Sequence, residues 1–343
     1  EKCKGIAAIV GAPSVNPAAK GKPLFNTAFF LADGAIAGNI HKTLLPNYDV
    51  FDEYRYFEPN PMAHNIVEHQ GQRYAITICE DLWNIADDPL YLQNPMDELI
   101  SLGPDVIINI AASPFNYLQA RTRQNILSRN AITYGLPVVY VNQVGGQTEL
   151  IFDGGSMVMN AAGEVVAKLK EFDEDFQVFE IQTENCKFEN AKPGSNGVPD
   201  PSAAISQMSE SQDIHIPAFN DILSPAATRL IHNALVLGIR DYFKKMGFSK
   251  AILGLSGGID SAVTLALAAS ALGNGNVRAI LLPSRFSSDH SIADARLLAE
   301  NLGVPHDIIP IEDAFGSFEK TLQPLFAGMP FNLTEENIQA RIR

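Results

Sequence analysis

The sequence predicts an α/β protein with two domains, and three observations support this prediction. The chain has 343 residues, which is long for a single hydrophobic core. In its first half, short apolar runs typical of strands alternate with helical stretches. After residue 250 the order is strand, helix, strand, helix, strand, which is typical of a parallel sheet.

In the first domain we expect helices over residues 95–102 and 121–134, because Gly135 and Pro137 close the second one. The expected strands of this domain are residues 5–10, 28–32, 74–79, 105–110, 137–141 and 155–159. Regular periodicity fades in the turn-rich, polar stretch that follows. We therefore place the first domain at residues 1–182, a linker at 183–223 and the second domain at 224–343.

The second domain is predicted to begin with a long helix over residues 226–246, whose apolar side chains recur on one face. A last helix begins at Leu333, in a Leu-Thr-Glu-Glu sequence. The elements expected between these two helices are strands 251–255, 277–282 and 306–311 and helices 261–272 and 289–302.

Composition excludes several classes of protein. The net charge of −14 argues against a general nucleic-acid-binding protein and against a protein that binds anionic membranes. The cysteines (Cys3, Cys79 and Cys186) are widely separated and odd in number, so they do not form a disulfide framework. No signal peptide is visible, and no apolar run approaches the length of about 18 residues typical of a membrane helix. We therefore expect a cytoplasmic protein without nucleic-acid or membrane partners.

The most informative segment is Ser-Gly-Gly-Ile-Asp-Ser-Ala at residues 256–262, between an expected strand and an expected helix. Such a junction directs unpaired backbone N–H groups and the positive helix end at one point, which suits a phosphate. Its glycines permit close approach of the backbone, and its serines offer hydroxyl donors. The aspartate would repel phosphates unless it held a divalent cation between them. The expected phosphate-binding residues are Ser256, Gly257, Gly258, Ile259, Asp260 and Ser261, with Asp260 as the metal ligand.

This segment differs from the two common nucleotide-binding loops. It contains neither Gly-x-x-x-x-Gly-Lys-Ser/Thr nor Gly-x-Gly-x-x-Gly. Its sequence and its place after a strand resemble the pyrophosphate loop of the N-type ATP pyrophosphatases, which split ATP between the α- and β-phosphates and transfer AMP to an acceptor oxygen. The alternative is a turn at a strand–helix junction that binds no ligand.

A second candidate site lies in the first domain. Cys79 ends an apolar run and precedes two acids, Glu80 and Asp81. A thiolate at this position could attack a carbonyl carbon, although an unpaired cysteine is also a common buried core residue. Lys42 follows another apolar stretch, and near a cysteine it would lower the thiol pKa and stabilise an oxyanion. The alternative for Lys42 is a solvated surface lysine.

Four segments together resemble the nitrilase superfamily and, more narrowly, the glutaminase domain of bacterial glutamine-dependent NAD synthetases. They are residues 41–59 (HKTLLPNYDVFDEYRYFEP), 78–83 (ICEDLW), 112–115 (ASPF) and 142–156 (NQVGGQTELIFDGGS). The resemblance implies an α-β-β-α sandwich, with Cys79 as the nucleophile that forms a glutamyl thioester and Lys42 as the group that stabilises the tetrahedral intermediate. The glutamine-contacting residues that it implies are Tyr48, Glu80, Ser113 and Arg121.

The sequence departs from this family in one respect. The family uses a Glu–Lys–Cys triad, and its glutamate lies upstream of the lysine in a Phe-Pro-Glu segment that is not found here. Glu53 and Glu58 are accounted for by the surrounding motif, so we assign neither as the general base. Since the sequence starts at Glu1 without a methionine and stops inside an expected helix at Arg343, we interpret both ends as truncated. In a complete chain without the base, glutaminase activity would be crippled.

The resemblance to NAD synthetases continues in the second domain, through residues 282–291 and 334–341. It implies a Rossmann-like parallel sheet of the ATP pyrophosphatase type. A second acidic metal ligand would lie beyond Arg343. Solvated side chains are the alternative for most of the residues to which the resemblance gives a role near the nucleotide or deamido-NAD. Those residues are Arg285, Ser287, Gln339 and Arg341.

The reaction implied by the resemblance uses glutamine, ATP and deamido-NAD, with Mg²⁺ as the cofactor. Glutamine would be hydrolysed at Cys79, and the ammonia would reach a second site. There ATP would adenylate the carboxylate of deamido-NAD, and ammonia would displace AMP to give NAD. Members of the family are homo-oligomers, and we expect one here. Two alternatives stay open: an ATP-dependent amidotransferase with another acid acceptor, and an ammonia-only synthetase or nucleotide-binding protein with an inactive glutaminase domain.

Overall fold

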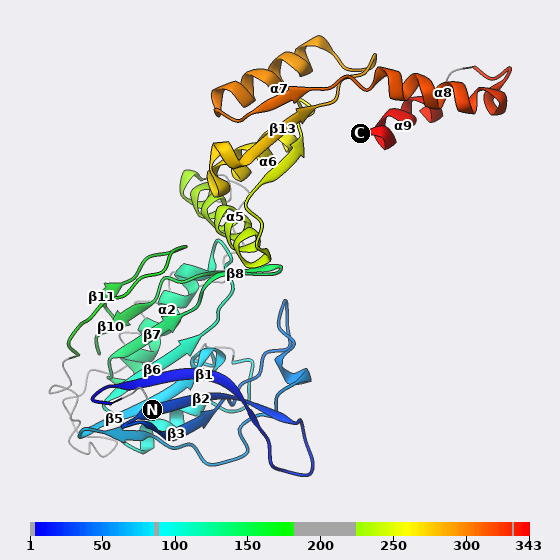
Figure 1. Cartoon of the computed structure of the whole chain (residues 1–343). Helices are drawn as coiled ribbons and strands as arrows, with labels where there is room; N and C mark the ends of the chain where they lie inside the picture. Colours follow the sequence, from blue (N-terminus) through cyan, green and yellow to red (C-terminus); the bar gives the residue numbers. More distant parts are fainter. Residues whose placement is uncertain (1–3, 86–88, 182–223, 331–332) are drawn as a thin grey trace. The chain divides into compact units, whose positions relative to one another are not determined.

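The structure is a computed structural model that describes residues 4–85, 89–181, 224–330 and 333–343. These residues form two compact units, which we describe separately (Figure 1). The first unit ends at residue 227 but leaves out residues 146–150, which belong to the second unit together with residues 228–343. The predicted linker, Cys3 and Cys186 lie outside the described residues. The predicted domain boundaries stay a prediction.

The first unit contains two large sheets. One is antiparallel and consists of β1 (Ala7–Val15), β2 (Leu24–Ala32) and β3 (Ala35–His41). The other has the order β11-β10-β7-β6-β5-β4, in which the three central strands are parallel and the outer strands pair antiparallel. Its strands are β4 (Val67–His69), β5 (Gln72–Ile78), β6 (Val106–Ala111), β7 (Val138–Asn142), β10 (Met157–Met159) and β11 (Val165–Lys168).

The remaining elements of this part of the chain are short, apart from one helix. They are the 3₁₀ turns η1 (Glu53–Arg55) and η2 (Cys79–Leu82), helices α1 (Pro95–Ser101) and α2 (Gln119–Tyr134), and the two-stranded ribbon of β8 (Val144–Gln147) and β9 (Leu150–Asp153). Local sequence sets the start of α1 and the end of α2, which lie at the predicted residues. Asn94 caps α1 by accepting a hydrogen bond from Met96 N (3.2 Å). Gly135 ends α2 in the left-handed conformation, at φ 64°.

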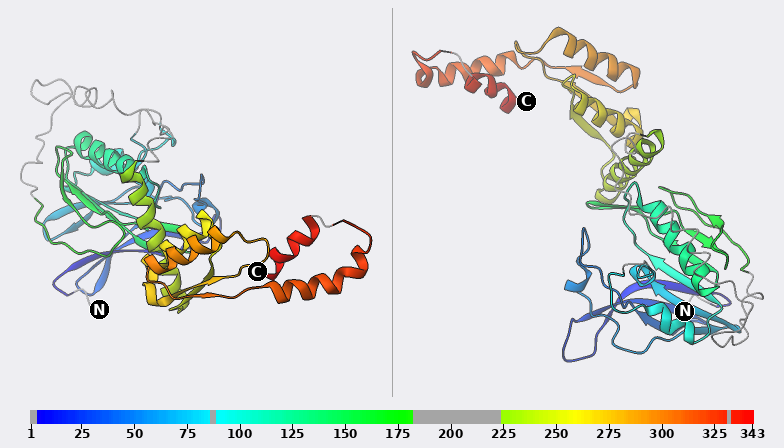
Figure 2. Two further views of the ribbon diagram at one scale, coloured as in Figure 1. Left: turned by 90° about the horizontal axis from the view of Figure 1, so that it is seen from above. Right: turned by 180° about the vertical axis from the view of Figure 1, so that it is seen from behind.

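The alternation of side chains along β5 explains the layers of the first unit. Successive residues of a strand point to opposite faces. Ala75 accordingly lies in a core with Leu127 of α2, whereas Ile76 packs with Phe30 of the three-stranded sheet. The described residues thus contribute three layers of the predicted α-β-β-α sandwich: helices, the six-stranded sheet and the three-stranded sheet (Figures 1 and 2).

The second unit confirms the predicted parallel sheet, with the strand order β12-β13-β14. Buried Leu265 of α6 and Ala299 of α7 pack with Val277 of the central strand. Helix α8 was not predicted, since Gly316 and Pro324 inside it weaken the helical signal. The elements are α5 (Pro225–Met246), β12 (Ala251–Gly254), α6 (Ile259–Leu272), η3 (Asn274–Asn276), β13 (Val277–Leu281), α7 (Asp289–Asn301), β14 (His306–Ile308), α8 (Glu312–Phe326) and α9 (Leu333–Ile342).

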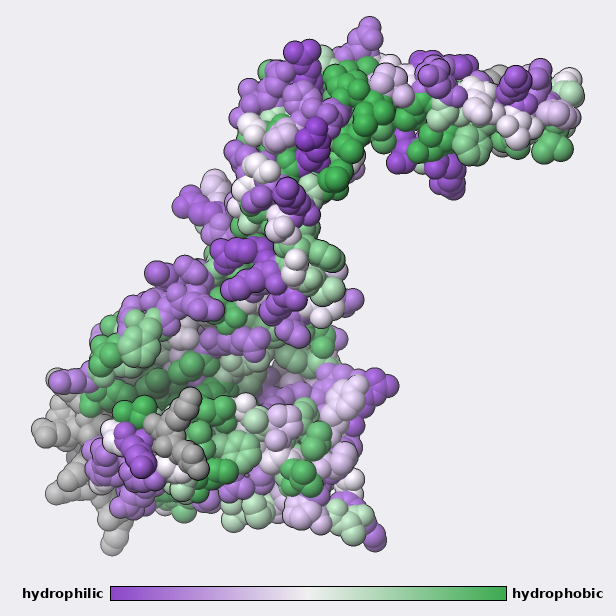
Figure 3. Space-filling view, viewed as in Figure 1, coloured by the Kyte–Doolittle hydropathy of each residue, from purple (hydrophilic) through white to green (hydrophobic). Residues whose placement is uncertain are grey.

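Apolar side chains also reach the surface of each unit (Figure 3). Val15 of β1 and Ile252 of β12 are both more than two-thirds exposed, at 76% and 70%. Exposed apolar residues are ordinary in folded proteins, so they do not by themselves locate a site. Within the described ranges, no helix combines the length and the apolar character needed to cross a lipid bilayer.

Candidate functional site

The predicted nucleophile lies where β5 ends. Ile78 is the last residue of the strand, and Cys79 begins the 3₁₀ turn η2. Cys79 has φ 46°, a conformation uncommon for residues other than glycine. Its side chain is buried in the core between the two sheets. A strained backbone that presents a reactive side chain at a strand end is typical of functional sites.

Lys42 is also buried, with only 2% of its surface exposed, so the interpretation as a solvated lysine is wrong. It directly follows β3, and its ammonium group pairs with the carboxylate of Glu53 on η1. Glu53 is fixed in turn, because its Oε1 accepts a hydrogen bond from Asn26 Nδ2 (2.7 Å). The structure therefore gives Lys42 a counter-ion that sequence analysis had left without a role.

The charges of Lys42 and Cys79 act on each other. Burial raises the pKa of the Cys79 thiol to about 11, and the nearby Lys42 cation opposes this rise. Burial by itself would lower the pKa of Lys42, but the negative charges of Cys79 and Glu53 outweigh burial and raise it. Lys42 is therefore held as a cation, which suits stabilisation of an oxyanion better than removal of a proton.

Asp81 fastens the Lys42 segment to the turn that carries Cys79. Its Oδ1 accepts hydrogen bonds from the backbone amides of Thr43 (3.0 Å) and Leu44 (2.9 Å), and its Oδ2 accepts one from Ile78 N (3.1 Å). Burial raises its pKa to about 6, although these backbone donors oppose the rise. Sequence analysis gave this residue no role. The available signal was an acid three residues after the end of a buried strand.

Glu80 faces two tyrosines. Its Oε1 accepts hydrogen bonds from the hydroxyls of Tyr48 (2.7 Å) and Tyr91 (3.2 Å). Burial raises the pKa of Glu80, while the two hydroxyl donors and Lys42 oppose that rise. The structure thus brings the predicted residues Tyr48 and Glu80 together beside Cys79. Sequence analysis missed Tyr91, because a tertiary contact places it beside Glu80. Asn84, which follows η2, holds the Tyr91 segment there, since its Nδ2 donates to Tyr91 O (2.8 Å).

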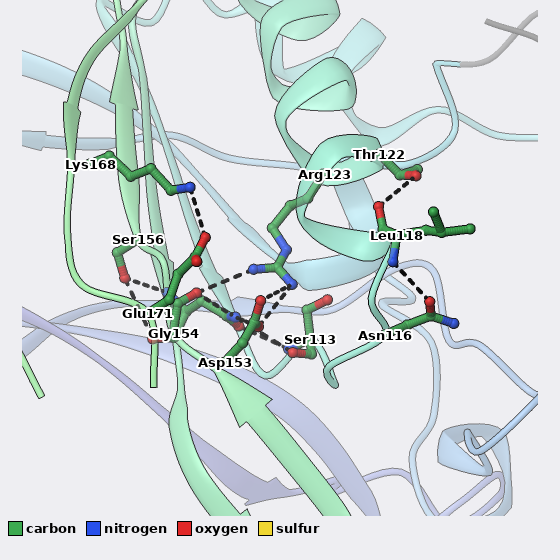
Figure 4. Close-up of polar contacts among 11 residues, drawn as sticks. Ser113, Asn116, Leu118, Thr122, Arg123, Asp153, Gly154, Ser156, Lys168 and Glu171 are labelled. Atoms are coloured by element: carbon green, nitrogen blue, oxygen red, sulfur yellow. Dashed lines mark hydrogen bonds and ion pairs between the residues drawn. The ribbon is translucent and has the colours of Figure 1, made fainter. Parts of the chain in front are cut away.

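Ser113 and Arg121 have different surroundings. Ser113 follows β6 and is buried, and its backbone N–H donates to Asn142 Oδ1 (2.9 Å). Arg121 is exposed on α2. The buried arginine of this helix is Arg123, which pairs with Asp153 close to Ser113 (Figure 4). Sequence analysis did not single out Arg123.

In the second unit, the loop before α6 is closed by its own serines. Ser256 Oγ and Ser261 Oγ are 3.0 Å apart, and Gly258 N donates to Ser256 Oγ (3.2 Å). Gly257 adopts φ 85°, and a side chain there would overlap the carbonyl of Ser291 on α7. The loop therefore requires glycine at this position for both its conformation and its packing.

The start of α6 offers backbone donors and one carboxylate. Gly258 is the N-cap residue, and no side chain caps the helix, so its first amides can serve an anion. Asp260 is exposed on the first turn. Among the described residues no group of three His, Cys, Asp or Glu side chains could bind a metal. One hard carboxylate fits Mg²⁺ if phosphate oxygens complete its coordination.

A cavity of about 430 Å³ adjoins this loop at the carboxyl ends of β12 and β13. Two of the predicted nucleotide-binding residues, Ser287 and Gln339, line it together with Ser256. Arg343 lines it as well, and its Nη2 donates to Ser287 Oγ (2.9 Å). Ligands of parallel α/β sheets bind at this edge of the sheet.

Two other predicted nucleotide-binding residues do not line the cavity. Arg341 is exposed on α9. Arg285 is directed to α8, where its guanidinium pairs with Glu312 and with Glu319 (3.3 Å). It also lies over the ring of Phe315, 5.0 Å from the centroid. The structure therefore gives Arg285 carboxylate partners on the helix that sequence analysis missed.

The two candidate sites lie in segments that match two different protein families. The carbon–nitrogen hydrolase family matches residues 1–188, and the NAD synthase family matches residues 231–343. The glutamine-dependent NAD(+) synthetase of Synechocystis sp. is 40% identical over 325 residues, which are 94% of this chain and 53% of that protein. Its counterpart from Thermotoga maritima is 39% identical over 325 residues, 93% of this chain and 55% of that protein. This chain thus spans about half the length of the curated relatives it matches.

Solved structures extend the similarity to the fold. The glutamine-dependent NAD+ synthetase of Acinetobacter baumannii, solved in complex with ADP, matches with a TM-score of 0.79 at 34% identity, over 100% of this chain and 57% of that chain. The enzyme of the same name from Cytophaga hutchinsonii matches with a TM-score of 0.74 at 17% identity, over 99% of this chain and 59% of that chain. The second similarity supports the fold alone.

Proposed function

Because the chain belongs to the carbon–nitrogen hydrolase family, we propose that its first unit hydrolyses the side-chain amide of glutamine. Its second unit uses the released ammonia to convert deamido-NAD into NAD, with cleavage of ATP. The observation that carries this proposal is the burial of the Cys79 thiol and the Lys42 cation in one region, where Lys42 opposes the rise that burial causes in the thiol pKa. The similarity to glutamine-dependent NAD(+) synthetases supports the choice of substrates.

In the first unit, the sulfur of Cys79 attacks the amide carbon of glutamine. The C–N bond breaks, the thiol proton ends on the departing ammonia, and a glutamyl thioester forms. Water then cleaves the C–S bond, which releases glutamate and restores the thiol. Lys42 stabilises the oxyanion in both steps. We do not give Lys42 the role of base, because Glu53 and Cys79 hold it protonated.

In the second unit, a carboxylate oxygen of deamido-NAD bonds to the α-phosphorus of ATP, and the bond to the β-phosphate breaks. The amides at the start of α6 and the hydroxyls of Ser256 and Ser261 receive the pyrophosphate. Asp260 would hold Mg²⁺, which when bound offsets the negative charge of the phosphates. Ammonia then displaces AMP from the adenylate and forms the carboxamide of NAD. The cytoplasmic location and the homo-oligomer remain predictions.

The decisive test supplies the purified protein with deamido-NAD, ATP and Mg²⁺ and measures NAD and glutamate. Product from both glutamine and ammonium is expected. Product from ammonium alone would mean an inactive first unit. The absence of product from both donors, with ATP bound, would contradict deamido-NAD as the acceptor and favour another carboxylic acid.

A further inference from the structure

Arg123 forms an ion pair that is almost completely shielded from water. Its Nη2 lies 3.0 Å and 3.3 Å from the two carboxylate oxygens of Asp153, and each side chain is about 2% exposed. The guanidinium also lies 5.7 Å from the ring centroid of Tyr140. A buried ion pair is a poor way to gain stability, since an apolar pair of similar volume often serves as well. The pair therefore calls for an explanation beyond packing.

Asn142 connects this ion pair to Ser113, which the family resemblance predicts to contact glutamine. Its Nδ2 lies 2.9 Å from Gly154 O and 3.3 Å from Asp153 Oδ1, and 3.5 Å from Ser113 O. An amide nitrogen has two hydrogens, so the two nearer acceptors use both. With Nδ2 fixed in this way, Oδ1 must face the other side, where it accepts from Ser113 N (2.9 Å).

The carbonyl of Gly154 is fixed by the same arginine. Arg123 Nη1 donates to Gly154 O at 3.2 Å (Figure 4). This oxygen therefore accepts hydrogen bonds from both Arg123 and Asn142. Gly154 has φ 69°, and a Cβ there would lie 3.2 Å from Val144 Cβ. The tight turn after β9 thus presents both acceptors for Asn142, the Asp153 carboxylate and the Gly154 carbonyl, in one place.

The last link is the segment that carries Ser113. Because its backbone N–H is used by Asn142, the hydrogen-bond donor that Ser113 can offer to a substrate is its hydroxyl. The segment is also tied to β9, since Phe115 N donates to Ile151 O at 2.6 Å. A contiguous chain of contacts therefore runs from Arg123 through Asp153 and Asn142 to Ser113.

We propose that Arg123 is a positioning residue for glutamine binding: with Asp153 it sets the orientation of the Asn142 amide, and Asn142 sets the position of Ser113. This inference rests on the proposed function of the first unit. Since Arg123 acts through the substrate-contacting segment and not on the Cys79 thiol, its loss should weaken glutamine binding more than it slows the chemical step.

The test compares glutamine hydrolysis by the wild-type protein with that of Arg123→Met, Arg123→Lys and the control Gln124→Met, which alters an exposed position on the same helix. For Arg123→Met we expect KM for glutamine to rise at least ~10-fold while kcat falls less than about threefold. Arg123→Lys keeps the charge and should recover part of the affinity. The rate of Cys79 alkylation by iodoacetamide should be unchanged in all three variants.

Asn142→Ala keeps the test decisive if Arg123→Met does not fold. It removes the link to Ser113 together with the hydrogen bonds from the amide to Asp153 and Gly154. The Arg123–Asp153 pair stays in place, so the same rise in KM is expected. A folded Arg123→Met or Asn142→Ala protein with unchanged KM would overturn the inference and leave the proposed function intact. A folded wild-type protein that releases no glutamate would overturn both.

Discussion

The two candidate sites hold their reactive groups in opposite surroundings. In the first unit Cys79, Lys42 and Glu80 are buried, at 9%, 2% and 4% exposure. Burial raises the pKa of Cys79 and Glu80, and neighbouring negative charges raise that of Lys42 against the effect of burial. In the second unit Ser256 and Asp260 are exposed, and the loop depends on backbone amides and glycine conformation. A thiol needs neighbouring charges to become a nucleophile, whereas a phosphate already carries the charge that an open helix end binds. Substitutions in the first site should therefore act by changing the pKa of its reactive groups. Substitutions in the second site should act by removing groups that bind the phosphates or the metal.

Cys79→Ala gives the largest expected effect and separates the two sites. Glutamine-dependent NAD formation should fall by at least about 10³-fold, because the proposed thioester forms on the Cys79 sulfur. Formation from ammonium should be unchanged, since the second site keeps all its residues. The same preparation, assayed with both donors, is its own control. Equal loss with both donors would contradict the assignment of two separate sites.

Asp260→Ala should affect both donors alike. Loss of the carboxylate that would hold Mg²⁺ should reduce NAD formation roughly 10²-fold or more with glutamine and with ammonium. Release of glutamate from glutamine in the absence of ATP should stay normal. Asp313→Ala is the matched control, because Asp313 is also an exposed acid in the first turn of a helix, α8. A loss confined to the glutamine-dependent reaction would place Asp260 outside the phosphate site.

How far the sequence predicted these sites depends on the distance between partners along the chain. Strand ends and motifs are local signals, so Cys79, Lys42 and the loop at residues 256–261 could be selected as candidates from the sequence. The side chains that orient them were missed, because they meet partners far away in sequence. Asp81 binds amides 37 and 38 residues before it, and Arg123 pairs with a residue 30 positions later. No pattern within one segment predicts such contacts.

In the second site, too, contacts between residues distant in sequence could not be predicted. Arg285 follows a strand beside several serines, which favours a place near phosphates, yet α8 supplies it with two carboxylates. Because α8 itself lacked a clear helical pattern, its charges could not be placed beside Arg285 from the sequence. Gly257 was expected to permit close approach of the backbone to a phosphate, which stays a prediction. Its close neighbour in the structure, the carbonyl of Ser291, could not be predicted from the sequence.

A pair of substitutions tests the electrostatic account of the first site. The Lys42 cation lowers the pKa of Cys79 and Glu53 raises it, against a value of about 11. Lys42→Met should therefore raise the pKa and slow alkylation of the thiol at pH 8, whereas Glu53→Gln should lower the pKa and accelerate it. In the wild-type protein the rate should rise about tenfold per pH unit below the pKa, since only the thiolate reacts. Iodoacetamide alkylation followed by mass spectrometry measures each rate, and equal shifts in both variants would contradict the coupling.

The smallest expected effect comes from an ion pair in the second unit. Arg278 of β13 and Asp307 of β14 form two close contacts, of 2.5 Å and 2.8 Å, which is better geometry than that of Arg123 and Asp153. Their side chains are 52% and 38% exposed, however, so water and salt replace each partner when the other is lost. Arg278→Ala should leave Tm unchanged within error.

The buried pair should respond in the opposite way. Removal of Arg123 leaves the Asp153 carboxylate without a cation in an environment that already raises its pKa, at a cost of about 3–5 kcal/mol. Thermal unfolding followed by circular dichroism, at low and at high salt, measures both variants. A larger loss of stability in Arg278→Ala than in Arg123→Met would mean that contact distance, and not burial, decides what an ion pair contributes in this protein.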